Sequence, residues 1–135
     1  MMNFDHHGVV HFEMVAENPE KLSQFYTNLF GWQITKMPMG ETDYYSVTTG
    51  PTDANGMPTQ PGYIGGGLAP RMMPEQKACN YVNVESVDQY LEKAKSLGAT
   101  ALSDKMPVPG MGWFAQLMDP EGNAFGIWQN DTSAG

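Results

Sequence analysis

His11 and Glu13 are the residues of this 135-residue chain whose types and spacing best suit chemistry. They stand two positions apart in the alternating segment GVVHFEMVA, residues 8–16, so a β-strand would place both side chains on the same face. An imidazole can bind a metal ion or act as a general base, and a neighbouring carboxylate can supply a metal-binding oxygen or abstract a proton. The pair predicts acid–base chemistry or a metal site. The alternatives are that His11 is a hydrogen-bonded wall residue and that Glu13 is an exposed, solubilising one.

A second group of polar and aromatic side chains falls on strands expected later in the chain. Alternation puts Tyr81 and Asn83 on one face of residues 79–84, opposite two valines, and Trp128 on the corresponding face of residues 123–129. We predict that this face stays uncovered and contributes to a small-molecule pocket. The predicted ligand-binding residues are Tyr81, Asn83, Trp113, Phe114, Gln116 and Trp128. The aromatic members would stack on a planar ligand, or would only fill the mouth of the pocket with apolar bulk.

Two amphipathic helices are expected to support these strands. The first is predicted to follow the N-cap Asn18 and to end at Gly31, and the second to follow the N-cap Ser86 and to end at Gly98. Apolar residues recur at helical spacing in both, so each helix should bury one face. On the first helix this face comprises Leu22, Phe25, Tyr26, Leu29 and Phe30.

Short alternating segments around the helices predict eight strands. They cover residues 8–16, 31–37, 43–49 and 62–69 in the first half, and residues 79–84, 99–105, 112–119 and 123–129 in the second. Both halves therefore have the order strand, helix, strand, strand, strand, an internal repeat. We predict a single α+β domain over residues 1–135, with module one at about 8–70 and module two at about 78–130. Segments 50–61 and 106–111 are rich in proline and glycine and are predicted to be loops.

The amino-acid composition limits the kinds of molecule that the protein is expected to bind. Seven Lys and Arg against 15 Asp and Glu give a net charge of −8, which opposes binding to nucleic acid or to anionic lipid. No segment approaches the ~20 consecutive apolar residues of a membrane helix. One cysteine, Cys79, excludes an intrachain disulfide. These features predict a cytoplasmic protein whose partner is a small molecule, with no nucleic-acid or membrane partner.

The paired modules and two segments together resemble the vicinal oxygen chelate (VOC) superfamily, which includes glyoxalase I, bleomycin-resistance proteins and extradiol dioxygenases. The segments are HFEMVAENPEKLSQFYTNLFGW at residues 11–32 and DPEGNAFGIWQ at residues 119–129. The chain looks most like single-chain lactoylglutathione lyase-related proteins, which have FGW after the first helix and a DPxGN turn before FGxWQ. The resemblance implies one curved eight-stranded mixed sheet around a cup, with the helices on its convex side. It also implies a homodimer, in which the cup lies within one chain or is shared by strand exchange.

The resemblance further implies a divalent metal ion at the base of the cup. Carried over by position, the first ligand falls on His11 and the others on Cys79, on Gly126 and within Gly65–Gly67. Glycine offers no side-chain ligand, and a catalytic metal generally needs about three protein ligands. We therefore expect a largely degenerate metal site and no cofactor. A divalent metal on His11, with Glu13 and Cys79 as weak additional ligands, remains the alternative, and Cys79 is otherwise a structural thiol.

Two functional interpretations follow. In the first, the protein handles a small organic molecule in an apolar, aromatic cup without a tightly bound metal, either by sequestering it or by acid–base chemistry through His11 and Glu13. In the second, it is a metal-dependent lyase or isomerase of the glyoxalase type that uses His11 and Glu13. The missing ligands favour the first interpretation, and whether the protein is an enzyme stays open.

Overall fold

A computed structural model describes residues 7–39, 42–72, 74 and 76–135. The contacts divide the chain into two units, residues 11–78 (the first module) and residues 79–135 together with the start of the chain up to Val10 (the second module). In chain order the elements are β1 (Val9–Ala16), α1 (Pro19–Phe30), β2 (Gln33–Met39), β3 (Thr42–Thr48), β4 (Gly65–Pro70), β5 (Cys79–Asn83), α2 (Val87–Ser96), β6 (Thr100–Ala101), β7 (Met106–Val108), β8 (Gly112–Met118) and β9 (Ala124–Asn130).

The first module pairs its strands in the order β2-β3-β4-β1, with β1 parallel to β4 and the other pairs antiparallel. Its core contains Tyr45, Val47 and Leu68, and Phe12 and Met14 of β1 pack against it. Phe12 and Met14 alternate along β1 with His11 and Glu13. The predicted division of β1 into an apolar face and a polar face is therefore confirmed.

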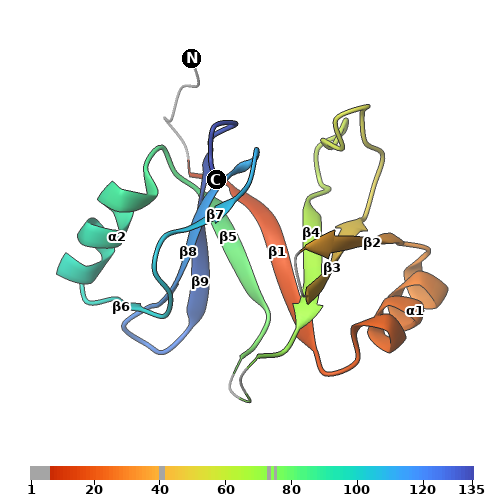
Figure 1. The fold of residues 1–135 in the computed structure, drawn as a ribbon, viewed down its shortest axis with the longest axis horizontal. Helices are drawn as coiled ribbons and strands as arrows, with labels where there is room; N and C mark the ends of the chain where they lie inside the picture. The colour runs from red at the N-terminus through yellow and green to blue at the C-terminus, as the bar shows by residue number, and fades with distance from the viewer. Residues whose placement is uncertain (1–6, 40–41, 73, 75) are drawn as a thin grey trace. The chain divides into compact units, whose positions relative to one another are not determined.

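Helix α1 begins and ends where the sequence predicts. The side chain of Asn18 accepts a hydrogen bond from the backbone N–H of Lys21 at 3.1 Å, and Gly31 adopts a positive φ of 73° as the C-cap. The predicted burial of its apolar face is wrong, because no residue of α1 is buried and Phe25, Leu29 and Phe30 are 55%, 57% and 59% exposed. The helix packs on the core mainly through Leu22. Figure 1 shows α1 next to β2.

The second module pairs its strands in the order β5-β9-β8-β6, and β7 also pairs with β8. Strand β5 is parallel to β9, and the other pairs are antiparallel. Its buried core consists of Val84, Val87, Ala115, Leu117 and Ile127. Tyr90, Leu91 and Ala94 of α2 pack against this core, so α2 covers one face of the sheet (Figure 1).

One predicted strand and one predicted loop of the second module are wrong. Residues 99–105 contain only the two-residue strand β6, and the predicted loop 106–111 contains β7. Between β6 and β7 the side chain of Ser103 accepts a hydrogen bond from the backbone N–H of Gln116 at 2.9 Å. This bond takes a donor that a regular ladder would use, so the expected strand is reduced to β6, and pairing with β8 resumes only at β7. The described residues thus contain nine strands instead of eight.

The predicted fold class is confirmed at the level of each module. Both modules are α+β units in which one helix lies against a mixed sheet with one parallel pair. No helix in the described part of the chain is long and apolar enough to span a membrane.

Candidate functional site

Three polar side chains of the first module, His11, Glu13 and Tyr44, meet at one carboxylate oxygen and form what we call the His11 cluster. The Nε2 of His11 lies 2.9 Å from the Oε2 of Glu13. The hydroxyl of Tyr44 donates to the same oxygen at 3.1 Å and lies 3.4 Å from the Nε2 of His11. One imidazole, one carboxyl and one phenol therefore share a single hydrogen-bonded network.

Strand register brings the cluster together. His11 and Glu13 share a face of β1, and Gly67 of β4 is the register partner of both Glu13 and Ser46 of β3. Tyr44 lies two residues before Ser46, on the same face, and so reaches across β4. A Cβ atom on Gly67 would lie 1.6 Å from the hydroxyl of Tyr44 and 2.8 Å from the Oε2 of Glu13. The missing side chain of Gly67 therefore makes the cluster sterically possible.

The cluster is reachable from solvent on its imidazole side. The side chain of His11 is 33% exposed, whereas that of Glu13 is 15% exposed. A solute can thus contact the imidazole first, with the carboxylate close behind it. The arrangement fixes a carboxylate behind an imidazole that solvent can reach, and a general base needs such a fixed position.

Sequence reasoning predicted His11 and Glu13 together but missed Tyr44. The alternation in the segment DYYSVTT was the available signal, because Tyr45 and Val47 share the buried face and Tyr44 must then lie on the other. What the sequence did not provide was the order of β3, β4 and β1 in the sheet, which brings Tyr44 within reach of Glu13.

The donor set does not fit a resident divalent metal ion. Among the described residues no group of three His, Cys, Asp or Glu side chains is placed to hold one. Cys79 opens β5 in the second module and is half-buried. Gly126 lies under the ring of Tyr81, whose Cε2 would be 2.3 Å from an added Cβ. Of the positions that the resemblance assigns to further ligands, Gly67 and Gly126 have no side-chain ligand and lie against tyrosines. His11 and Glu13 alone leave a metal short of about three protein ligands.

Five of the predicted ligand-binding residues share one face of the second module. Gly126 is the register partner of Tyr81 and of Gln116, and Trp128 is the partner of Asn83 and of Phe114. The amide of Gln116 donates to the hydroxyl of Tyr81 at 2.8 Å. The rings of Tyr81 and Phe114 meet edge to face with centroids 6.1 Å apart. Tyr81 is only 5% exposed, so it supports this face instead of projecting from it.

The sixth predicted residue, Trp113, lies on the opposite face of β8. It precedes Phe114 in an extended strand, so the two side chains point to opposite faces. Trp113 packs against the core of the second module, and its indole N–H donates to Asp131 at 3.0 Å. The ammonium of Lys105 lies 4.5 Å from the centroid of its ring. Trp113 thus has a structural environment that differs from that of the other five residues.

Comparison with known proteins agrees with the resemblance to the VOC superfamily. The sequence model described as glyoxalase-like domain matches residues 10–128. A protein of Mycobacterium bovis (strain ATCC BAA-935 / AF2122/97) with glyoxylase in its name, CFP32, is 31% identical over 115 residues, covering 83% of this chain and 41% of its own length. A Mycobacterium tuberculosis protein of the same name matches equally well. The chain thus spans well under half the length of these relatives.

Solved structures of low identity share the fold. Hypothetical protein BH1468 from Bacillus halodurans C-125 aligns with a TM-score of 0.63 at 13% identity, over 96% of this chain and 98% of that one. A methylmalonyl-CoA epimerase variant of Streptomyces coelicolor, in complex with 2-nitronate-propionyl-CoA, aligns with a TM-score of 0.62 at 14% identity, over 90% of this chain and 96% of that one. The closer likeness to lactoylglutathione lyase-related proteins stays a prediction.

Proposed function

The chain belongs to the glyoxalase-like domain family, and from this premise we propose that its first module binds a small organic molecule at His11 and moves a proton on it through Glu13, without a resident metal ion. The observation that carries this proposal is the His11 cluster, in which Nε2 of His11 and the hydroxyl of Tyr44 lie 2.9 Å and 3.1 Å from one oxygen of Glu13.

Each side chain of the cluster has a distinct role in this proposal. Glu13 is the base, because it is the carboxylate of the cluster and its contacts with the other two groups hold it in a fixed position. His11 contacts the bound molecule, because its side chain is the more exposed of the pair at 33%. Tyr44 holds the carboxylate in place by donating to it. The proton that Glu13 takes from the substrate returns from the Glu13 carboxyl to the same carbon, directly or after exchange with solvent. A compound with an acidic C–H next to a carbonyl group is the class of substrate that such a base can act on.

Binding without proton transfer is the other form of the same proposal. The Streptomyces coelicolor epimerase variant, which has this fold, is in complex with 2-nitronate-propionyl-CoA, so the fold accommodates organic ligands. The name of the CFP32 relative points to glyoxylase activity, but that protein is more than twice as long as this chain. Neither relative identifies the ligand of this chain.

The test is proton exchange on simple carbonyl compounds in D2O. A panel of two- to six-carbon aldehydes, ketones and keto acids is incubated with the metal-free full chain, and loss of the C–H signal beside the carbonyl is followed by proton NMR. We expect exchange that falls by about 10²-fold or more in Glu13→Gln, and ligand binding that weakens in His11→Ala. Glu17→Gln, the same change at an exposed position just after β1, is the matched control and should retain both.

The possible outcomes separate the interpretations. Binding without exchange in the wild-type chain supports sequestration. No binding by any compound, or binding and exchange that His11→Ala and Glu13→Gln leave intact, contradicts a site at the His11 cluster. Saturable thermal stabilisation by Ni, Zn, Mn, Fe or Co that disappears in His11→Ala would instead favour the metal-dependent lyase or isomerase.

A further inference from the structure

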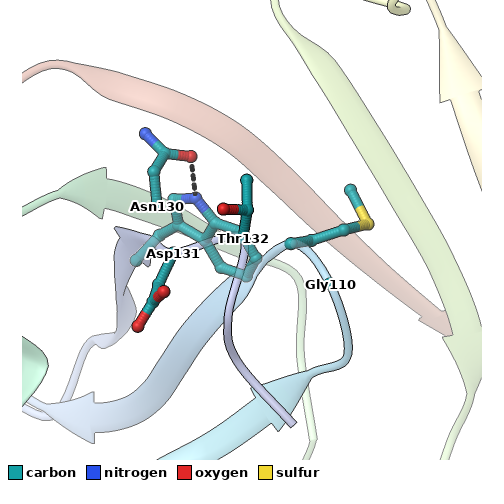
Figure 2. Close-up of a pocket in the computed structure, with 6 residues that line it drawn as sticks. Gly110, Asn130, Asp131 and Thr132 are labelled. Atoms are coloured by element: carbon teal, nitrogen blue, oxygen red, sulfur yellow. Dashed lines mark hydrogen bonds between the residues drawn. The ribbon is translucent and has the colours of Figure 1, made fainter.

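The second module contains a pocket at the end of β9 that the proposed function does not use. It has a volume of about 470 Å³, in the range of small-molecule sites, and its lining residues are Gly110, Met111, Trp128, Asn130, Asp131 and Thr132. Figure 2 shows these side chains, with Asn130, Asp131 and Thr132 following one another at the end of the strand. All six come from the turn after β7 and from the segment that ends β9.

Hydrogen bonds fix both sides of this pocket. The backbone N–H of Asp131 donates to the carbonyl of Met111 at 2.9 Å, and that of Gly110 donates to the carbonyl of Ala134 at 2.9 Å. The C-terminal segment is therefore tied to the turn that carries Met111. Ala134 is 6% exposed, so this connection is packed as well as hydrogen-bonded.

The indole of Trp128 forms a fixed flat wall. Its N–H donates to the side-chain oxygen of Asn130 at 2.8 Å, the dashed bond in Figure 2. Its ring lies over Gly112, where an added Cβ would be 2.5 Å from the ring carbon Cζ2. Held at its edge and backed by glycine, the indole has little freedom to rotate. Met111, which also lines the pocket, is 59% exposed and has a flexible thioether side chain that can adapt to a bound ring.

Apart from the carboxylate of Asp131, the side chains that line this pocket are uncharged. None of the six lining residues is Lys, Arg or His. The carboxylate of Asp131 accepts hydrogen bonds from the hydroxyl and backbone N–H of Ser133 and from the indole N–H of Trp113. These bonds, those from Ser133 foremost, lower the pKa of Asp131, so the group is an anion committed to those donors. Asn130 and Thr132 provide an amide and a hydroxyl beside the indole.

We infer that this pocket binds a neutral, flat aromatic compound with a hydroxyl or amide substituent. The ring stacks on Trp128 beside Met111, and the substituent forms a hydrogen bond with Thr132. An anion is disfavoured because the pocket has no cationic side chain and the whole chain has a net charge of −8. A purely aliphatic compound would lose the stacking on the indole. The pocket shares no residue with the His11 cluster, so either proposal can fail without the other.

The test uses three probes that share one ring and differ in charge: benzyl alcohol, benzoate and benzylamine. Each is titrated into the 15N-labelled full chain, and the indole N–H signal of Trp128 is followed by NMR after assignment by Trp128→Phe. We expect benzyl alcohol to shift this signal saturably, with affinity at least tenfold higher than that of benzoate or benzylamine. Trp128→Leu should reduce the affinity at least tenfold. Phe25→Leu, an exposed aromatic of the first module, should leave it unchanged.

A second variant keeps the indole and tests the hydrogen bond. Thr132→Val should lower the affinity for benzyl alcohol three- to tenfold and leave the affinity for toluene unchanged. This comparison holds even if Trp128→Leu does not fold. Tighter binding of benzylamine or benzoate than of benzyl alcohol overturns the assigned chemical class. The site itself is overturned if no probe shifts the indole signal. It is also overturned if benzyl alcohol still binds with unchanged affinity in both Trp128→Leu and Thr132→Val.

Discussion

Gly67 determines how close the phenol of Tyr44 can come to the carboxylate of Glu13. His11 and Glu13 could be predicted as a pair because neighbours two apart on one strand share a face whatever the rest of the fold does. The contribution of Tyr44 depends on β4 lying between β1 and β3, and strand order comes from tertiary packing that one sequence does not display. Glycine within a strand often marks a bend or a close backbone approach, and Gly67 makes room for a neighbouring side chain.

Gly67→Ala should therefore destabilise the first module and break the His11 cluster. The new Cβ would lie 1.6 Å from the hydroxyl of Tyr44 and 2.3 Å from its Cζ, so the ring must move. We expect a loss of about 1–3 kcal/mol in the free energy of unfolding, measured by urea denaturation. Gly65→Ala is the matched control, because its Cβ would meet only the Val47 carbonyl oxygen, at 3.8 Å. Equal effects of the two substitutions would contradict this account.

The side chain of Asn83, a predicted ligand-binding residue, is expected to lower the stability of the folded chain. Its side-chain oxygen is buried and has no hydrogen-bond partner among the described residues, an arrangement that costs about 1–3 kcal/mol. Asn83→Leu, which has a similar shape, should leave the melting temperature unchanged or raise it. Asn80→Leu, at an exposed position of the same strand, is the control and should give no gain. A clear drop in melting temperature for Asn83→Leu alone would show that the amide is satisfied in solution.

Helix and strand boundaries were predicted correctly where they depend only on residues near one another in the sequence. The N-caps Asn18 and Ser86 mark the helix starts correctly, because a cap depends on residues three apart. The prediction of a strand over residues 99–105 failed because that segment depends on a residue distant in the sequence. The side chain of Ser103 accepts a hydrogen bond from the backbone N–H of Gln116, and no residue near Ser103 in the sequence indicates that partner. The exposed apolar face of α1 shows the same limit, because periodicity indicates a face but not what covers it.

The turn between β8 and β9 should make stability depend on acid pH. Asp119 accepts backbone hydrogen bonds from Asn123 and Glu121, both at 2.9 Å, and these, that from Asn123 foremost, lower its pKa below the ordinary 3.8. The folded chain then binds this proton less readily than the unfolded chain does. The stabilisation is present above the ordinary pKa, which the unfolded chain has, and is lost as the pH falls through the lower folded value.

Asp119→Asn should therefore flatten the acid side of the stability curve. The measurement is the free energy of unfolding in urea between pH 2 and pH 6. Glu121→Gln, a neighbouring carboxylate that accepts none of these hydrogen bonds, is the control and should keep the wild-type slope. An unchanged slope in Asp119→Asn would mean that other carboxylates, such as Asp131, account for the acid dependence.

At the scale of the whole molecule, the homodimer and the cytoplasmic location remain predictions from the resemblance and the composition. Phe25, Leu29 and Phe30 each expose more than half of their surface. In a monomer these neighbouring apolar side chains would lie in water, whereas a dimer could cover them. We expect light scattering after size exclusion to give twice the chain mass of 14.9 kDa. A mass of one chain at micromolar concentration would show that the resemblance does not extend to assembly.

The internal repeat read from the sequence has a physical counterpart in two separate cores. Leu68 is fully buried in the first core and Leu117 in the second, and the two clusters share no residue. Leu68→Ala and Leu117→Ala should each cost about 2–5 kcal/mol in the free energy of unfolding. Because the two side chains have no partner in common, the loss in the double variant should equal the sum of the single losses within about 0.5 kcal/mol.

The contrasting pair is Val47→Ala with Leu68→Ala, because Val47 belongs to the same cluster as Leu68. For this pair the loss in the double variant should differ from the sum of the single losses. Urea denaturation of all five variants decides the matter, and strong non-additivity between Leu68 and Leu117 would mean that the modules do not pack as separate cores.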